Sequence, residues 1–97
     1  ATETILLVED EDHVRLYARL VLVEKGYTVI EARNGQEALD RCLASAAPMH
    51  LLLTDVVLPG IGGNRLAANL TALRPGLKTL FMSGYTEDEL RSATEEQ

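Results

Sequence analysis

The chain has 97 residues, of which 46% are hydrophobic, and its formal net charge at pH 7 is −6. This length suits one globular domain, and the apolar content excludes a disordered chain. The negative charge and the lack of any basic cluster exclude a nucleic-acid-binding surface. A single cysteine, Cys42, rules out an internal disulfide, so we expect a reduced, cytoplasmic protein with a buried thiol. No apolar stretch approaches the thickness of a bilayer and no signal-peptide pattern is present, so we expect no direct membrane contact.

Apolar runs alternate with helical patterns from the start of the chain. Ile5–Val8 is an uninterrupted apolar run, which predicts a strand over Thr4–Val8 that is buried on both faces. Apolar positions at helical spacing then predict a helix that is N-capped by Asp12, runs to about Lys25 and is ended by Gly26. A β-branched run over residues 27–32 predicts the second strand.

The alternation continues to the end of the chain. Asn34, followed three residues later by Glu37, has the spacing of a capping box and predicts a helix that Pro48 interrupts. The further predicted elements are a strand over residues 50–54, a glycine-rich loop over 59–63, a helix over 64–74, a strand over 78–82 and a weakly apolar helix over 86–94. Strands and helices that alternate with short links predict a single α/β domain over residues 1–97 with one parallel sheet.

Acidic residues follow two of the predicted strands. Glu9 and Asp10 come directly after the first strand, and Asp55 follows the third. The carboxyl ends of parallel strands meet at one edge of the sheet, where ligands bind in open α/β folds. Carboxylates that crowd together repel one another unless a cation lies among them, and a site with only oxygen donors favours Mg²⁺. The sequence therefore predicts a Mg²⁺ site formed by these three residues.

Three motifs resemble the receiver domain of two-component response regulators. They are Ile5-Leu6-Leu7-Val8-Glu9-Asp10-Glu11, Leu53-Thr54-Asp55-Val56-Val57-Leu58-Pro59-Gly60 and Leu80-Phe81-Met82-Ser83-Gly84-Tyr85. The motifs follow the family's order and spacing along the chain, and their wording is most similar to receivers attached to hybrid sensor histidine kinases. The resemblance implies a flavodoxin-like, doubly wound sheet with the strand order 2-1-3-4.

The resemblance also implies a function, which is that of a phosphoacceptor in a His-Asp phosphorelay. Asp55 would accept a phosphoryl group from a kinase histidine, and Asp10 would be the direct Mg²⁺ ligand with Glu9 beside it. Val57 would offer its backbone carbonyl to the metal, and Ser83 would supply the switch hydroxyl that bonds the phosphoryl oxygen. Such an isolated domain catalyses its own phosphotransfer and is otherwise no enzyme.

The first predicted helix carries a second apolar stripe, formed by Leu16, Leu20 and Val23. Either the helix is buried on two sides or the stripe is a docking face, and the sequence leaves both readings open. In the family this helix meets the histidine-bearing helices of the kinase. The resemblance therefore implies a sensor histidine kinase or a histidine phosphotransfer domain as partner.

The sequence departs from the family pattern after the last predicted helix. The family's fifth strand, which ends in a lysine, and its fifth helix have no counterpart here, so the resemblance implies a C-terminally incomplete domain. The two lysines, Lys25 and Lys78, fall at the far end of the predicted sheet from Asp55, because a five-residue strand spans roughly 16 Å. An unpaired fourth strand predicts a homodimer or a swapped association through its edge.

Other functions are weighed against the same residues. A pseudo-receiver that serves only as an interaction surface would fit the missing lysine. A phosphatase of the haloacid dehalogenase type would need an acid two residues after Asp55, where Val57 stands. A dinucleotide-binding half-domain would need a glycine-rich turn after the first strand, and none follows Val8.

Overall fold

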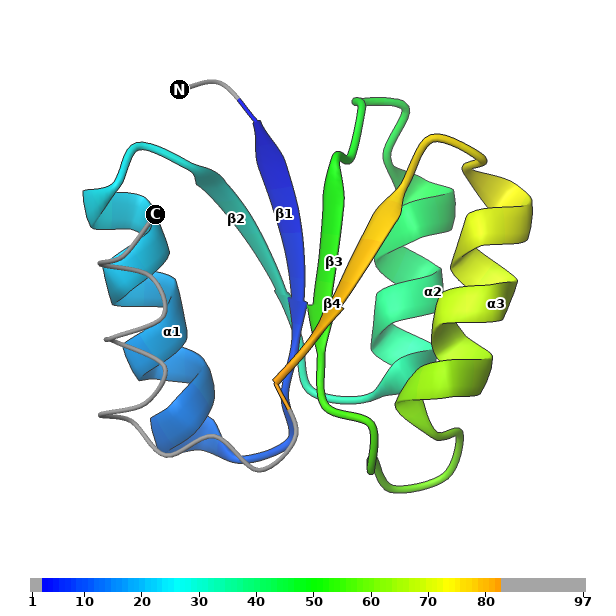
Figure 1. Ribbon diagram of the computed structural model, residues 1–97, viewed down its shortest axis with the longest axis horizontal. Helices are drawn as coiled ribbons and strands as arrows, with labels where there is room; N and C mark the ends of the chain where they lie inside the picture. Colours follow the sequence, from blue (N-terminus) through cyan, green and yellow to red (C-terminus); the bar gives the residue numbers. More distant parts are fainter. Residues whose placement is uncertain (1–2, 83–97) are drawn as a thin grey trace.

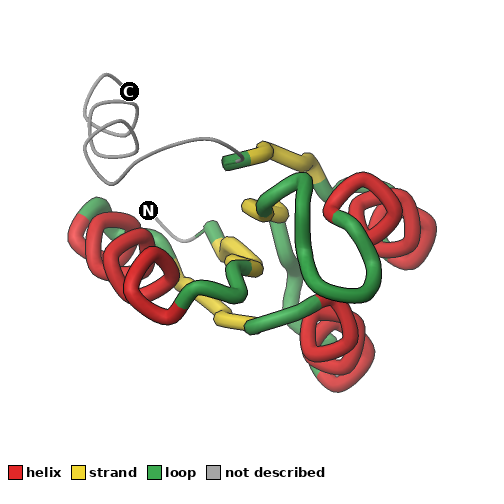
Figure 2. Tube along the Cα trace, turned by 90° about the horizontal axis from the view of Figure 1, so that it is seen from below, coloured by secondary structure: helices red, strands yellow, loops and turns green. Residues whose placement is uncertain are grey.

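The computed structural model describes residues 3–82, which form a parallel four-stranded sheet between two layers of helices (Figures 1 and 2). The elements follow in the order β1 (Thr4–Val8), α1 (Asp12–Glu24), β2 (Thr28–Ala32), α2 (Gly35–Ala44), β3 (Leu51–Thr54), α3 (Gly63–Leu73) and β4 (Lys78–Phe81). The observed strand order, β2-β1-β3-β4, confirms the predicted fold class. Helix α1 covers one face of the sheet, whereas α2 and α3 cover the other (Figure 2).

The helices of residues 3–82 are all too short or too polar to cross a membrane. The predicted helix over residues 86–94 lies outside the described part of the chain. Most of the other predicted boundaries differ from the observed ones by one or two residues.

Helix α1 begins one residue earlier than predicted. Glu11, and not Asp12, is the N-cap residue, and its side chain makes no capping hydrogen bond. Asp12 lies in the first turn, where its carboxylate accepts a 2.7 Å hydrogen bond from Arg15. An acidic side chain is stabilised there by the positive end of the helix dipole as well as by the guanidinium. At the other end Gly26, with a φ of 97°, terminates the helix as predicted.

The predicted capping of α2 is confirmed. Asn34 Oδ1 accepts a 2.9 Å hydrogen bond from the backbone N–H of Glu37. The Glu37 carboxylate turns back to Arg33 and accepts one bond from its backbone N–H and another from its guanidinium, each 2.8 Å long. These bonds with Arg33 lower the pKa of Glu37 to about 2. They fix the chain where β2 passes into α2, at the carboxyl edge of the sheet.

Strand β1 contributes side chains to the hydrophobic core on both faces of the sheet, because it lies between β2 and β3. Ile5 and Leu7 pack on the α1 side, whereas Leu6 and Val8 pack on the side of α2 and α3. All four side chains are at most 2% exposed. The uninterrupted apolar sequence of β1 therefore fills two cores at once, as a central parallel strand requires.

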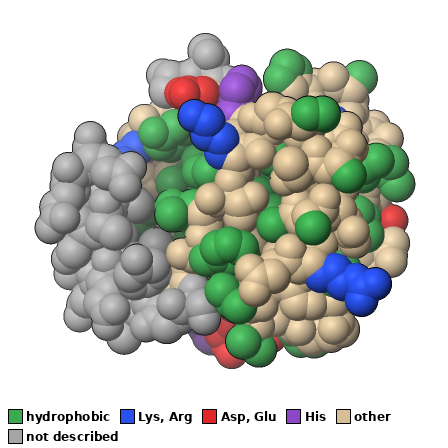
Figure 3. Space-filling view, turned by 45° about the vertical axis from the view of Figure 1, so that its right-hand side comes forward, with side chains coloured by type: hydrophobic (Ala, Val, Ile, Leu, Met, Phe, Trp, Pro, Cys, Tyr) green, Lys and Arg blue, Asp and Glu red, His purple; other side chains and the backbone are tan. Residues whose placement is uncertain are grey.

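Several large apolar side chains remain at the surface. Leu16, Leu20 and Val23 are 47%, 53% and 48% exposed, so the second stripe of α1 is open to solvent. Leu43, near the end of α2, is 69% exposed. Figure 3 shows another face of the molecule, where apolar side chains reach the surface in several separate places.

Arg74, which follows α3, ties the far ends of two helices together. Its guanidinium donates to the carbonyls of Cys42, Ser45 and Ala47 and, through Nε, to Cys42 Sγ at 3.0 Å. Carbonyls at a helix C-terminus lack partners within the helix, and a cation suits the negative end of the dipole. Arg74, which follows α3, thus caps the C-terminal end of α2.

The central position of β3 predicts a large cost for truncating its buried side chain. Leu52→Ala removes a fully buried side chain and should lower the free energy of unfolding by about 2–5 kcal/mol. Leu43→Ala is the matched control and should change it by less than about 0.5 kcal/mol. Urea unfolding of both variants measures the difference. Similar losses in the two would contradict the assigned core.

Candidate metal centre

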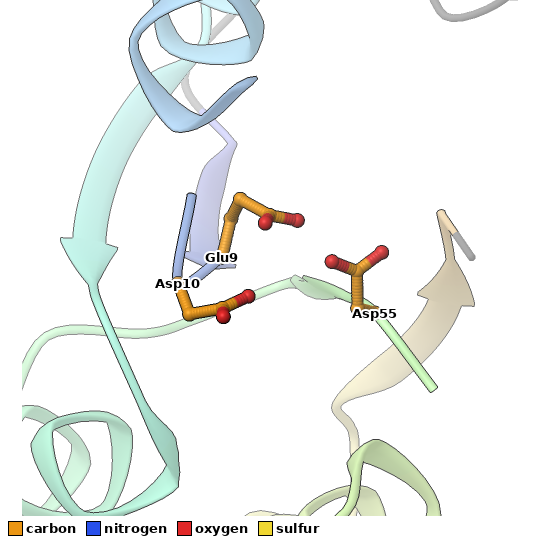
Figure 4. A group of neighbouring side chains, drawn as sticks. All are labelled: Glu9, Asp10 and Asp55. Carbon is orange, nitrogen blue, oxygen red and sulfur yellow. The ribbon is translucent and has the colours of Figure 1, made fainter. Parts of the chain in front are cut away.

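The register of the sheet brings acids from two loops together. Val8 of β1 pairs with Thr54 of β3, so the residues that follow, Glu9 and Asp55, leave the sheet side by side. Glu9, Asp10 and Asp55 each place a carboxylate oxygen within 4.8 Å of the others. Figure 4 shows the three carboxyl groups facing one another beyond the ends of β1 and β3. The structure thus brings together the three acids that the sequence selected.

The three carboxylates differ in their surroundings. Glu9 is only 3% exposed, Asp55 is half-buried and Asp10 is exposed. Burial is the main cause that raises the pKa of Glu9 to about 8, and a hydrogen bond with Asp55 and the charges of Asp55 and Asp10 add to it. The backbone N–H of Glu11, which donates to Glu9 Oε1 at 2.9 Å, acts in the opposite direction. Without a cation, Glu9 therefore holds a proton at neutral pH.

The donor set fits a hard divalent cation. All three residues offer oxygen atoms, and the cluster contains neither histidine nor cysteine. Oxygen donors of this kind suit Mg²⁺, which neutralises carboxylates that would otherwise repel one another. The raised pKa of Glu9, caused by burial first and by its acidic neighbours after it, makes a third negative charge in the cluster unfavourable without a cation.

The peptide of Asp55 is enclosed on two sides. Thr54, itself fully buried, donates its hydroxyl to the Asp55 carbonyl at 3.1 Å. Gly63 begins α3 so close by that a Cβ on it would lie 1.9 Å from the same carbonyl oxygen. The N–H of Gly63 also donates to the carbonyl of Val56 at 2.7 Å. The sequence pattern alone did not assign this role to Gly63, although the pair Gly62-Gly63 at the start of the helix was a signal for it.

Two of the predicted site residues, Val57 and Ser83, do not belong to the observed cluster of carboxylates. The side chain of Val57, two residues beyond Asp55, is 77% exposed, which fits a residue proposed to act through its backbone. Ser83 lies outside the described residues. The structure therefore positions the acidic part of the predicted site.

A family model agrees with this geometry. The model described as the response regulator receiver domain matches residues 5–96. The chain belongs to the response regulator receiver family. Its parallel sheet and its acidic cluster are those expected of such a receiver.

Relatives of this receiver include parts of larger signalling proteins. It is 42% identical over 85 residues to the sensor kinase CckA of Brucella abortus, covering 88% of this chain but only 9% of that relative. The crystal structure of the receiver domain from the hybrid histidine kinase CckA superposes with a TM-score of 0.71 and 32% identity, with 96% of each chain covered. The receiver thus resembles a module of a hybrid kinase.

A second solved relative has been captured with ligands. The response regulator TrrA of Thermotoga maritima, in complex with Mg²⁺-BeF, matches with a TM-score of 0.76 and 29% identity over 95% of this chain and 80% of TrrA. TrrA has also been solved in complex with the histidine kinase ThkA, where the match covers 87% of this chain and 71% of that one at 30% identity and a TM-score of 0.74.

The raised pKa of Glu9 predicts that the metal-free protein loses stability as pH rises. The folded state holds a proton between the ordinary pKa of 4.5 and about 8, whereas the unfolded state releases it. The free energy of unfolding should therefore fall across this window by at most about 1.4 kcal/mol per pH unit. Glu9→Gln should flatten the slope in EDTA, and the exposed control Glu24→Gln should keep it. An unchanged slope in Glu9→Gln, measured by urea unfolding, would refute the assignment.

The contact between Gly63 and Asp55 predicts a cost for any side chain at position 63. Gly63→Ala forces the Asp55 peptide to move and should destabilise the fold by about 1–3 kcal/mol. Gly76→Ala provides the control, since a Cβ there meets nothing within 4 Å. Thermal unfolding compares the two variants, and equal midpoints would show that the loop yields without cost.

Proposed function

We propose that this receiver accepts a phosphoryl group from a kinase histidine onto Asp55. In this proposal Mg²⁺ is held by the carboxylates of Glu9, Asp10 and Asp55 and by the backbone carbonyl of Val57. The observation that carries it is the convergence of three carboxylates within 4.8 Å at the carboxyl edge of the sheet. The Mg²⁺-BeF complex of TrrA, a relative with the same fold, supports the choice of metal.

The chemistry needs little beyond positioning and neutralised charge. A carboxylate oxygen of Asp55 attacks phosphorus, the bond between phosphorus and the histidine nitrogen breaks, and that nitrogen keeps the electron pair. When bound, Mg²⁺ supplies positive charge that lets the anionic carboxylates and the anionic phosphoryl group approach. The proposal assigns Ser83 as the hydroxyl that then bonds a phosphoryl oxygen. Asp55 is half-buried, so it is held by the fold and open to a donor from solvent.

Helix α1 is the proposed docking surface for a sensor histidine kinase or a histidine phosphotransfer domain. Its stripe of Leu16, Leu20 and Val23 is about half exposed and apolar, which suits packing against the helices of a partner. The helix starts two residues after Asp10, so a partner lying along it would approach the sheet edge that carries the acidic cluster. The complex of TrrA with ThkA supports such a partner. We place the exchange in the cytoplasm.

The edge of β4 is a second proposed contact, between two copies of the chain. Within the described residues β4 pairs with β3 alone, and Leu80 on it is 50% exposed. An open strand edge offers unpaired backbone groups to another strand. A homodimer or a swapped association through β4 would satisfy them.

The assignment of Asp55 is tested by mapping phosphorylation. The protein is incubated with a small acyl phosphate and Mg²⁺, and the modified residue is identified by mass spectrometry. We expect a single modified residue, Asp55, and no modification in EDTA or in Asp55→Asn. The exposed control Asp40→Asn should react like the wild type. Undiminished modification of Asp55→Asn would place the nucleophile elsewhere, and an unreactive wild type would favour a receiver that serves only as an interaction surface.

A further inference from the structure

Arg15, in the first turns of α1, joins three segments around the acidic cluster. Its side chain is only 14% exposed. One terminal nitrogen donates to the backbone carbonyl of Glu9 at 2.9 Å, and the other donates to Asp12 at 2.7 Å. Its Nε lies 3.4 Å from a carboxylate oxygen of Glu31 on β2. The guanidinium thus connects the loop after β1, the start of α1 and the neighbouring strand.

The bond from Arg15 to the Glu9 carbonyl is one of several hydrogen bonds that fix Glu9 in place. Its N–H donates to the Ala32 carbonyl of β2 at 3.1 Å, and its carboxylate accepts from the N–H of Glu11. Arg15 completes this set by fixing the peptide plane between Glu9 and Asp10. That plane sets the direction in which the Asp10 side chain leaves the backbone.

The positive charge of Arg15 is paired with carboxylates outside the acidic triad. Its ionic partners among the described residues are Asp12 and Glu31, and neither belongs to the acidic triad. The guanidinium therefore orients the triad through the backbone and leaves the triad's carboxylate oxygens for a cation. A lysine carries the same charge, but its single ammonium lacks the planar fork that reaches three separate acceptors.

We infer that Arg15 is a positioning residue for the metal centre, which fixes the peptide between Glu9 and Asp10 so that both carboxylates stay directed toward Asp55. The inference rests on the proposed Mg²⁺ site. Residues that orient metal ligands from outside the coordination sphere commonly change metal affinity by about 10- to 100-fold when they are replaced.

Arg19 separates this role from simple attachment of α1 to the sheet. Its Nε lies 3.2 Å from the other carboxylate oxygen of Glu31, so it also ties α1 to β2. The hydrogen bonds of the described residues include none from Arg19 to the loop after β1. Arg19→Gln therefore removes a tie between helix and strand and leaves the Glu9 carbonyl bonded.

The test is a calorimetric titration of Mg²⁺ into the wild type, Arg15→Gln, Arg15→Lys, Arg19→Gln and Asp10→Asn. Urea unfolding first establishes conditions in which each variant is folded. Arg15→Gln and Arg15→Lys should both weaken Mg²⁺ binding by about 10-fold or more. Arg19→Gln should stay within twofold of the wild type. In the metal-free protein, the amide nitrogen resonance of Asp10, which shares the fixed peptide plane, should shift in both Arg15 variants and stay unchanged in Arg19→Gln.

The outcomes are distinct. Wild-type affinity in Arg15→Gln would overturn the inference, and so would full rescue by Arg15→Lys, which would reduce the role to charge. Should Arg15→Gln fail to fold, Arg15→Lys decides by the same two measurements. Equal Mg²⁺ affinity in the wild type and Asp10→Asn, or no binding by the wild type, would overturn the metal site itself and with it the role of Arg15.

Discussion

Repulsion among three carboxylates at one sheet edge is the constraint on which the rest of this structure depends. Glu9, Asp10 and Asp55 would lower their energy by moving apart, but Val8 and Thr54, which precede Glu9 and Asp55, are paired across buried strands. The sheet between two apolar cores therefore holds the three acids in place, and burial, with the charges of Asp55 and Asp10, raises the pKa of Glu9. The same arrangement makes the site receptive to a divalent cation.

The two ligand-bearing loops are held by their backbones. On the Glu9 side the bonds come from Ala32 and Arg15, and on the Asp55 side from Thr54 and the close approach of Gly63. Each loop thus has its peptide groups fixed by residues outside the triad. Fixing the backbone in this way preorganises the carboxylates and, under the proposed function, leaves their oxygens for metal and phosphoryl chemistry.

The sequence sufficed for the fold and for the acidic triad because both depend on local patterns. In an apolar segment followed by acids, the apolar run predicts a buried strand, and the acidic residues directly after it predict where that strand ends. The N-cap at Asp12 was misassigned because an acidic residue suits the cap and the first turn alike, and its guanidinium partner decided between them. Arg15 and Arg74 act through carbonyls of other segments, up to 32 residues away for Arg74, so no local pattern could reveal them.

The exposed stripe of α1 shares no side chain with the acidic triad, although the helix starts two residues beyond Asp10. On the proposed docking face, substitutions at Leu16, Leu20 or Val23 would change which kinase fits and leave every oxygen donor in place. Duplicated genes for such a receiver could therefore drift apart in partner choice while selection holds the chemistry constant. Insulated signalling pathways could then evolve from one ancestor by surface changes to a single helix.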